Sequence, residues 1–162
     1  MVNSILVLCI GNICRSPMAE GLLKKHLPNM TIQSAGLGAL VGHPADPIAV
    51  GLLAERDIDI ATHRAQFINQ AICMQSDLIL VMDRDQKVRV EQRYPYARGK
   101  VFRLGESADF DIFDPYGNDR DVFEACLRLI DKGVDAWTRR IAVLGHLSAA
   151  RHAARNVDAS GA

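Results

Sequence analysis

A thiol and a guanidinium stand at the two ends of one short segment, Cys9 to Arg15, whose sequence is CIGNICR. The segment follows an apolar run, Ser4–Leu8, and leads into a stretch with helical character. Consecutive backbone N–H groups between a strand and a helix N-terminus form a concave nest that binds a tetrahedral dianion. The segment therefore predicts a phosphate cradle. Cys9 would attack from below the phosphorus, and the planar fork of Arg15 would hold two phosphoryl oxygens.

The residues inside the segment suit such a cradle. Gly11 permits close backbone approach and unusual dihedral angles, and Asn12 tolerates the left-handed region. Ser16 is a good N-cap for the following helix, and Pro17 suits its first turn. The Ser16 hydroxyl could also reach the sulfur of Cys9, whose thiolate form a positive field favours. A nucleotide loop of the G-x-x-x-x-G-K-[ST] type is excluded because its glycines and lysine are missing.

Each of these residues also has an ordinary structural interpretation. A cysteine at the end of a buried strand is usually an inert core residue, so Cys9 gains its chemical meaning only from the strand before it and the helix after it. Asp114 is a candidate proton donor, because Pro115 restricts it to the extended geometry of a loop. Asp-Pro is, however, also a common turn dipeptide.

The elements that must position these groups alternate between strand and helix signals. Continuous apolar runs are typical of parallel strands covered on both faces. The order predicts an α/β fold: a doubly wound four-stranded parallel sheet with helices on both faces and the phosphate loop after the first strand. Ligands of such sheets bind at the carboxyl ends of strands where the strand order reverses, which is where Cys9 would lie. The predicted strands are Ser4–Leu8, Thr31–Ala35, Asp77–Met82 and Lys100–Leu104, and the predicted helices are Ser16–Leu27, Asp46–Arg56, Phe67–Met74, Arg84–Arg93 and Asp119–Leu147.

Three separated segments resemble the low-molecular-weight protein tyrosine phosphatases. Residues 9–17 (CIGNICRSP) match the family's phosphate loop, and residues 34–36 (SAG) with 62–65 (THRA) are similar to the stretches that buttress it. Residues 114–119 (DPYGND) are similar to the general-acid loop. The resemblance covers nearly the whole chain. The wording SAGLGALVG at 34–42 is similar to that of bacterial members linked to exopolysaccharide and capsule export.

The resemblance implies a catalytic set of Cys9 as nucleophile, Arg15 as phosphate ligand and Asp114 as general acid. A cysteinyl-phosphate intermediate would split the hydrolysis of phosphotyrosine into two steps. From sequence alone His63 would be a surface histidine and Asp83 an ordinary N-cap. The resemblance instead assigns phosphate binding and loop support to Ile10, Gly11, Asn12, Ile13, Cys14, Ser16, Ser34 and His63, and the substrate pocket to Leu40, Tyr116 and Asp83. Ile10 and Ile13 would also line that apolar slot, which is deep enough to reject phosphoserine.

Size and composition set the remaining expectations. A chain of 162 residues suggests one domain, over residues 1–148, with a mobile tail at 149–162 that lacks a periodic apolar face. A formal net charge of zero provides no global field for nucleic acid or an anionic membrane. No apolar stretch approaches the ~20 residues of a membrane span, and no signal peptide is visible, so we expect a cytoplasmic protein. The four cysteines show no metal spacing, and we expect neither metal nor cofactor. The implied partner is a phosphotyrosine protein, in particular a bacterial membrane tyrosine autokinase.

Three alternative functions can be weighed on single residues. An arsenate reductase coupled to thioredoxin needs two further cysteines in relay, whereas Cys73 stands alone in the middle of the chain. Protein-arginine phosphatases typically carry threonine where this chain has Ile13. A catalytically dead binding module would lack a reactive group, and none is missing here.

Two further questions stay open at this stage. Cys14 either traps an oxidised Cys9 as a disulfide or only fills space under the loop. If Asp114 is not the acid, the replacements to consider are Asp83, Asp111 and Asp119.

Overall fold

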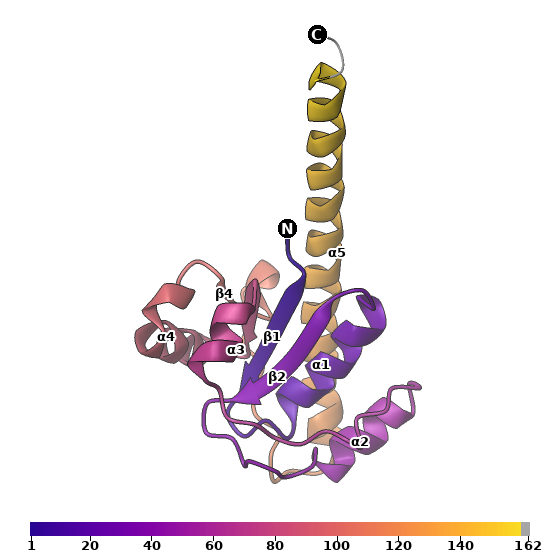
Figure 1. The fold of residues 1–162 in the computed structure, drawn as a ribbon. Helices are drawn as coiled ribbons and strands as arrows, with labels where there is room; N and C mark the ends of the chain where they lie inside the picture. The colour runs from indigo at the N-terminus through magenta and orange to yellow at the C-terminus, as the bar shows by residue number, and fades with distance from the viewer. Residues whose placement is uncertain (160–162) are drawn as a thin grey trace.

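The computed structural model describes the backbone of residues 1–159 and the side chains of residues 1–147. One sheet of parallel strands, in the order β2-β1-β3-β4, runs through the centre of the molecule (Figure 1). Val7 in β1 pairs with Ser34 on one side and with Leu80 on the other, so the strand order reverses at β1. The predicted doubly wound sheet is confirmed. Its strands are β1 (Ser4–Cys9), β2 (Thr31–Gly36), β3 (Leu78–Val81) and β4 (Val101–Arg103).

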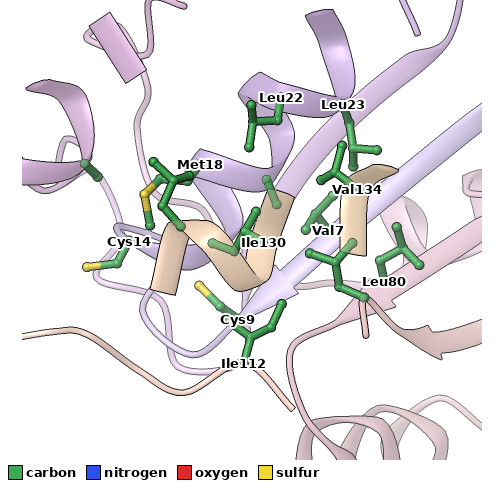
Figure 2. Packing of buried hydrophobic residues seen from close by; sticks show 14 of the residues in the cluster. Val7, Cys9, Cys14, Met18, Leu22, Leu23, Leu80, Ile112, Ile130 and Val134 are labelled. Carbon is green, nitrogen blue, oxygen red and sulfur yellow. The ribbon is translucent and has the colours of Figure 1, made fainter. Parts of the chain in front are cut away.

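Helices cover both faces because the strands are apolar on both faces. Val7 and Cys9 belong to a cluster that includes residues of α1 and α5, whereas Leu6 and Leu8 pack in a second cluster on the opposite face with Val90 of α4. Figure 2 shows the first cluster, where labelled side chains of α1 and α5 lie near Val7 and Cys9 of β1. The helices are α1 (Arg15–His26), α2 (Pro47–Ala54), α3 (Gln70–Gln75), α4 (Arg84–Arg93) and α5 (Arg120–Ala159), with 3-10 turns at Pro95–Ala97 and Glu106–Ala108.

Local capping explains where the predicted helix limits hold and where they shift. α4 spans Arg84–Arg93 as predicted, and the Asp83 carboxylate caps it by accepting from the backbone N–H of Gln86 at 2.8 Å. α3 starts three residues later than predicted. Asn69 caps it by accepting from the N–H of Ile72, and Phe67 instead bridges to Gly36 beside the sheet.

The last helix is longer than predicted. α5 continues past Leu147 to Ala159, and Figure 1 shows this end extending beyond the sheet. The alanine-rich sequence of 148–159 explains the extension, since alanine and arginine favour helix without an apolar face to bury. The domain limit at 148 and the mobility of 149–162 stay predictions, and residues 160–162 lie outside the described residues. None of the helices in the described part of the chain has the length and apolar character that a membrane span requires.

Candidate active site

The backbone carbonyls of the phosphate loop all point outward into hydrogen bonds. The Cys9, Ile10 and Gly11 carbonyls accept from backbone N–H groups of residues 37, 38 and 40 at 2.9, 3.0 and 3.1 Å. The Asn12 carbonyl accepts from the His63 ring at 2.7 Å, and the Ile13 carbonyl accepts from a backbone N–H of residue 46 at 2.8 Å. A carbonyl only accepts, so His63 carries its proton on Nε2. With the carbonyls turned away, the loop's N–H groups are left to face the concave side.

The concave side holds donors that lack a protein acceptor. Among the described residues, the N–H groups of Gly11, Ile13, Cys14 and Arg15 donate to no protein acceptor. Arg15 is 3% exposed, and its Nε is buried without a hydrogen-bond partner among the described residues. A buried donor without a partner costs free energy comparable to a lost hydrogen bond, so these groups define a site that an anion would complete.

Asn12 is the hub that fixes the shape of this loop. It is fully buried at φ 56°, in the left-handed region that its residue type tolerates. Its Oδ1 accepts from the backbone N–H of Gln66 at 2.9 Å, which leaves its Nδ2 to donate to Ser16 and Ser34, each at 2.9 Å. Ser34 in turn donates to the carboxylate of Glu20. The network therefore reaches from the loop through β2 to α1.

This network also sets the direction of the hydrogen bond at the Cys9 sulfur. The Ser16 Oγ accepts from Asn12, which leaves its own proton to donate to Sγ of Cys9, 2.9 Å away. The sulfur also lies 3.3 Å from the backbone nitrogen of Asn12. The Cys9 sulfur therefore has two hydrogen-bond donors directed at it. Ser16 therefore reaches the Cys9 sulfur as predicted, but it is not the N-cap. α1 begins at Arg15 with Cys14 as its cap residue and has no side-chain cap.

A cavity of about 180 Å³ opens above the loop. Tyr116, predicted as a pocket residue, lines the cavity at its rim and is 59% exposed. Leu40, also predicted, lines it from the loop after β2. The cavity walls are mostly apolar apart from Arg15 and Asp114, which suits an aromatic ring above a bound phosphate. The full lining is Cys9, Ile10, Gly11, Ile13, Cys14, Arg15, Gly38, Leu40, Asp114 and Tyr116.

Asp114 faces the arginine of the loop. Its Oδ2 lies 3.2 Å from Nη2 of Arg15, and its Oδ1 accepts from the N–H of Tyr116 at 3.2 Å. About half of the Asp114 side chain is exposed at the cavity mouth. The other nitrogen of the fork, Nη1, donates to the Ile112 carbonyl at 2.9 Å. The carboxylate therefore stands across the cavity mouth from the cradle, where a leaving group would depart.

The three alternative acids are engaged elsewhere. Asp83 caps α4 and lies 3.7 Å from Nη1 of Arg15 without lining the cavity, and its place in the substrate pocket stays a prediction. Asp111 is paired with Arg103 at 2.8 Å. Asp119 accepts from the N–H of Val122 at the start of α5. Only Asp114 among the four carboxylates lines the cavity.

The glycine that permits a close backbone approach is not the one predicted. Gly11 does not have a positive φ and has room for a Cβ, so its backbone is ordinary, and the left-handed residue is its neighbour Asn12. The close approach instead occurs at Gly36, where a Cβ would stand 2.4 Å from the Ile10 carbonyl oxygen. Gly36 therefore allows the end of β2 to lie against the loop.

The other cysteines are buried thiols. Burial raises the pKa of Cys73 to about 11 and that of Cys126 to about 12, and it raises the pKa of Cys14 further still. Figure 2 shows the sulfur of Cys14 directed away from Cys9. Both cysteines are free and buried, and the disulfide between Cys9 and Cys14 stays a prediction.

Sequence reasoning missed two residues of the site. Gln66 holds Asn12 through its backbone N–H, and its side chain donates to the Ser34 carbonyl at 2.8 Å. Glu20 accepts from Ser34 and so extends the chain of hydrogen bonds that starts at Cys9. The position of Glu20, one turn after Ser16 on the same helix face, was the available signal.

A cysteine and an arginine in an anion-binding loop, at the reversal point of a parallel sheet, define the class of cysteine-dependent phosphatases. Residues 4–145 match the family described as low molecular weight phosphotyrosine protein phosphatase. The chain therefore belongs to this family and is a tyrosine phosphatase, a hydrolase, which confirms the resemblance seen in the sequence.

Individual relatives agree over most of their length. The probable low molecular weight protein-tyrosine-phosphatase EpsP of Ralstonia nicotianae is 53% identical over 145 residues, which make up 90% of this chain and 100% of that protein. The structure of Vibrio vulnificus Wzb in complex with benzylphosphonate is 41% identical with a TM-score of 0.84, covering 86% of this chain and 99% of that one. The YwlE arginine phosphatase from Geobacillus stearothermophilus is 32% identical with a TM-score of 0.81, covering 86% and 93%.

Proposed function

We propose that the protein hydrolyses phosphotyrosine through a phosphocysteine at Cys9. The phosphoryl group sits on the free N–H groups of residues 11 and 13–15 and on Arg15, with the sulfur of Cys9 below the phosphorus. The S–P bond forms as the bond from phosphorus to the tyrosyl oxygen breaks. The observation that carries the proposal is the set of unpartnered donors around the cradle, above all the buried Nε of Arg15. Donors fixed in advance stabilise the charge that spreads over the equatorial oxygens.

Asp114 supplies the proton that the departing tyrosinate requires. In the second step it takes a proton from water, the water oxygen bonds to phosphorus, and the S–P bond breaks to release phosphate and the thiolate. Ser16 supports both steps, because a hydroxyl that donates to the sulfur at 2.9 Å stabilises the thiolate before attack and after release. Nη2 of Arg15 pairs with Asp114, and a bound phosphate would take over that nitrogen.

The apolar cavity favours an aromatic phosphate ester. Ile13, Leu40 and Tyr116 provide surfaces for a ring, and the benzylphosphonate named for the Vibrio vulnificus Wzb complex carries its ring one atom from phosphorus, through a methylene where phosphotyrosine has the ester oxygen. The substrate is then a phosphotyrosine protein. We propose a bacterial membrane tyrosine autokinase of exopolysaccharide or capsule export, with the phosphatase acting in the cytoplasm. This assignment rests on the resemblance at residues 34–42 and on relatives named EpsP and Wzb.

Matched phosphopeptides test the assignment. We expect kcat/KM on a phosphotyrosine peptide to exceed that on the same peptide with phosphoserine or phosphoarginine by at least tenfold. An arginine phosphatase is the second candidate because of the YwlE likeness, and Ile13 is the wall residue that opposes it. Ile13→Thr should therefore lower the preference for phosphotyrosine, whereas a wild-type enzyme that prefers phosphoarginine would contradict the proposal.

A further inference from the structure

A buried arginine outside the cavity anchors the segment that leads to Asp114. Arg103 ends β4, and only 8% of its side chain is exposed. Its Nη1 donates to Asp111 at 2.8 Å, its Nη2 donates to Asp109, and its Nε lies 3.7 Å from Glu106. One guanidinium therefore gathers three carboxylates from the six residues 106–111, which form a tight turn between β4 and the acid loop.

The position of Arg103 is fixed from behind. Its backbone carbonyl accepts from the indole N–H of Trp137 in α5 at 3.1 Å, and its backbone N–H donates to Glu106 at 2.9 Å. The turn closes tightly at Gly105, where a Cβ would stand 2.2 Å from the Phe110 carbonyl oxygen. The carboxylates of Asp109 and Asp111 raise the pKa of Arg103 well above its ordinary value, so the charge is permanent. The Arg103 guanidinium is thus a positive charge held in a fixed position.

Only a few residues separate Asp111, the partner of Arg103, from Asp114. Asp111 precedes Ile112, whose N–H donates to the Met82 carbonyl and whose carbonyl accepts from Nη1 of Arg15 at 2.9 Å. Asp114 follows two residues later. Beyond its approach to Arg15, the Asp114 carboxylate has a hydrogen bond only from Tyr116 of its own loop among the described residues. The direction from which Asp114 approaches the cavity therefore depends on where Asp111 and Ile112 are held.

We infer that Arg103, through its ion pair with Asp111, is a positioning residue for Asp114. Arg103 does not line the cavity and contacts no reacting group. It sets the path of residues 111–114 so that the carboxyl group reaches the leaving oxygen. The inference rests on the proposed role of Asp114 as general acid.

Substitution of Asp111 gives the cleanest test, because 46% of its side chain is exposed and Arg103 keeps Asp109 and Glu106 as partners. A displacement of about 1 Å far from the chemistry can cost up to about 10²-fold. We expect Asp111→Ala to lower kcat on phenyl phosphate by roughly tenfold and kcat on para-nitrophenyl phosphate by much less, with KM and the Ki of inorganic phosphate unchanged. Arg103→Lys should lie between wild type and Asp111→Ala. The control is Arg84→Gln, which removes an exposed partner of Asp109 without touching Asp111 and should have no effect.

A double-mutant cycle separates positioning from a general loss of structure. In an Asp114→Asn background the effect of Asp111→Ala on phenyl phosphate should vanish, since the group it positions is gone. The basic limb of the kcat–pH profile should persist in Asp111→Ala and flatten in Asp114→Asn. If Asp111→Ala lowered kcat equally on both substrates, or lowered it as much in the Asp114→Asn background as in wild type, the positioning role of Arg103 would be wrong while the proposed function could still hold. If Asp114→Asn itself showed no leaving-group dependence, the acid role in the proposed function would fail first.

Discussion

The phosphate loop and the acid loop are built in opposite ways. In the phosphate loop Asn12 and Ser16 are fully buried, and all carbonyls from Cys9 to Ile13 are hydrogen-bonded. In the acid loop Phe113 and Tyr116 are 43% and 59% exposed, and Asp114 is bound only to Arg15 and to its own loop within the described chain. The anion site is therefore preorganised, whereas the proposed proton donor, Asp114, lies on an exposed segment whose course depends on a few contacts at its base.

This contrast separates two quantities that an assay can measure. Binding of phosphate should depend mainly on the buried network, and on the acid loop only through the pairing of Asp114 with Arg15. Protonation of the leaving group should depend on the acid loop while the cradle stays intact. Substitutions in one region should therefore show whether the other is affected, and a substitution outside both should leave catalysis unchanged.

The largest effect is expected at the nucleophile. Cys9→Ser should abolish turnover of para-nitrophenyl phosphate while phosphate and vanadate still bind, because a hydroxyl does not supply the anion at neutral pH but leaves the cradle unchanged. Arg15→Lys should fail almost as badly and also lose phosphate binding, since a point charge does not replace a planar fork. Steady-state kinetics and titration calorimetry provide the two readouts. A serine variant that kept a tenth of wild-type activity would exclude Cys9 as nucleophile.

The second largest effect concerns the acid loop. Asp114→Asn should reduce kcat by roughly 10²–10⁴-fold on phosphotyrosine or phenyl phosphate, whose leaving groups need a proton, and by less on para-nitrophenyl phosphate. The Ki of inorganic phosphate should not rise, because the cradle keeps its donors and Arg15 no longer pairs with Asp114. Equal losses on good and poor leaving groups would show that Asp114 only shapes the cavity.

A smaller effect on catalysis is expected from the hub of the buried network. Asn12→Ala leaves Ser16, Ser34 and the N–H of Gln66 without their partner and places alanine at φ 56°. We expect kcat/KM to fall by roughly 10²-fold, because the loop loses its shape, and phosphate to bind more weakly. Asn69→Ala is the matched control, since Asn69 caps α3 on the surface and should cost about 1 kcal/mol of stability with no change in activity. Unchanged phosphate affinity in Asn12→Ala would mean that the network does not organise the cradle.

The smallest effect lies outside both loops. Hydrogen bonds from the backbone N–H of Asn3, and from Ser4, lower the pKa of Asp77 below its usual value. A carboxylate with a lowered pKa stabilises the folded state above its unfolded pKa, and the contribution is lost as the pH falls through the folded pKa. Because Asp77 is exposed, Asp77→Asn should cost only about 1 kcal/mol at pH 7. Urea unfolding should show the difference narrowing below about pH 4, with kcat unchanged at pH 7. A difference that grew in acid would contradict this sign.

The parts that the sequence predicted well are those that depend on neighbouring residues. The phosphate loop occupies contiguous positions, so residue types such as Asn12 report directly on the local backbone. Apolar runs indicated all four strands to within a residue or two at each end, and α4 has the predicted limits because Asp83 supplies a local cap.

The parts that were missed depend on the tertiary structure. Gln66 and Glu20 carry no chemical signal of their own, and they join the network only because β2 and α1 lie beside the loop. The crowding at Gly36 arises from a residue 26 positions earlier in the chain, the carbonyl of Ile10. In the sequence alone, the three acidic residues that contact Arg103 look like an ordinary charged turn. α5 ran longer than predicted because its end has high helix propensity and no apolar stripe to reveal it.

The central claim, that Cys9 forms a covalent bond to phosphorus in a preorganised cradle, has one direct measurement. Wild-type enzyme and Asp114→Asn would be mixed with excess para-nitrophenyl phosphate, quenched within milliseconds and digested for mass spectrometry. The account predicts one phosphoryl group on the peptide that contains Cys9, attached through sulfur, with more of it in Asp114→Asn because that variant lacks the base for the second step. A phosphoryl group on another residue, or turnover with no phosphoenzyme at any quench time and no burst of para-nitrophenol, would contradict it.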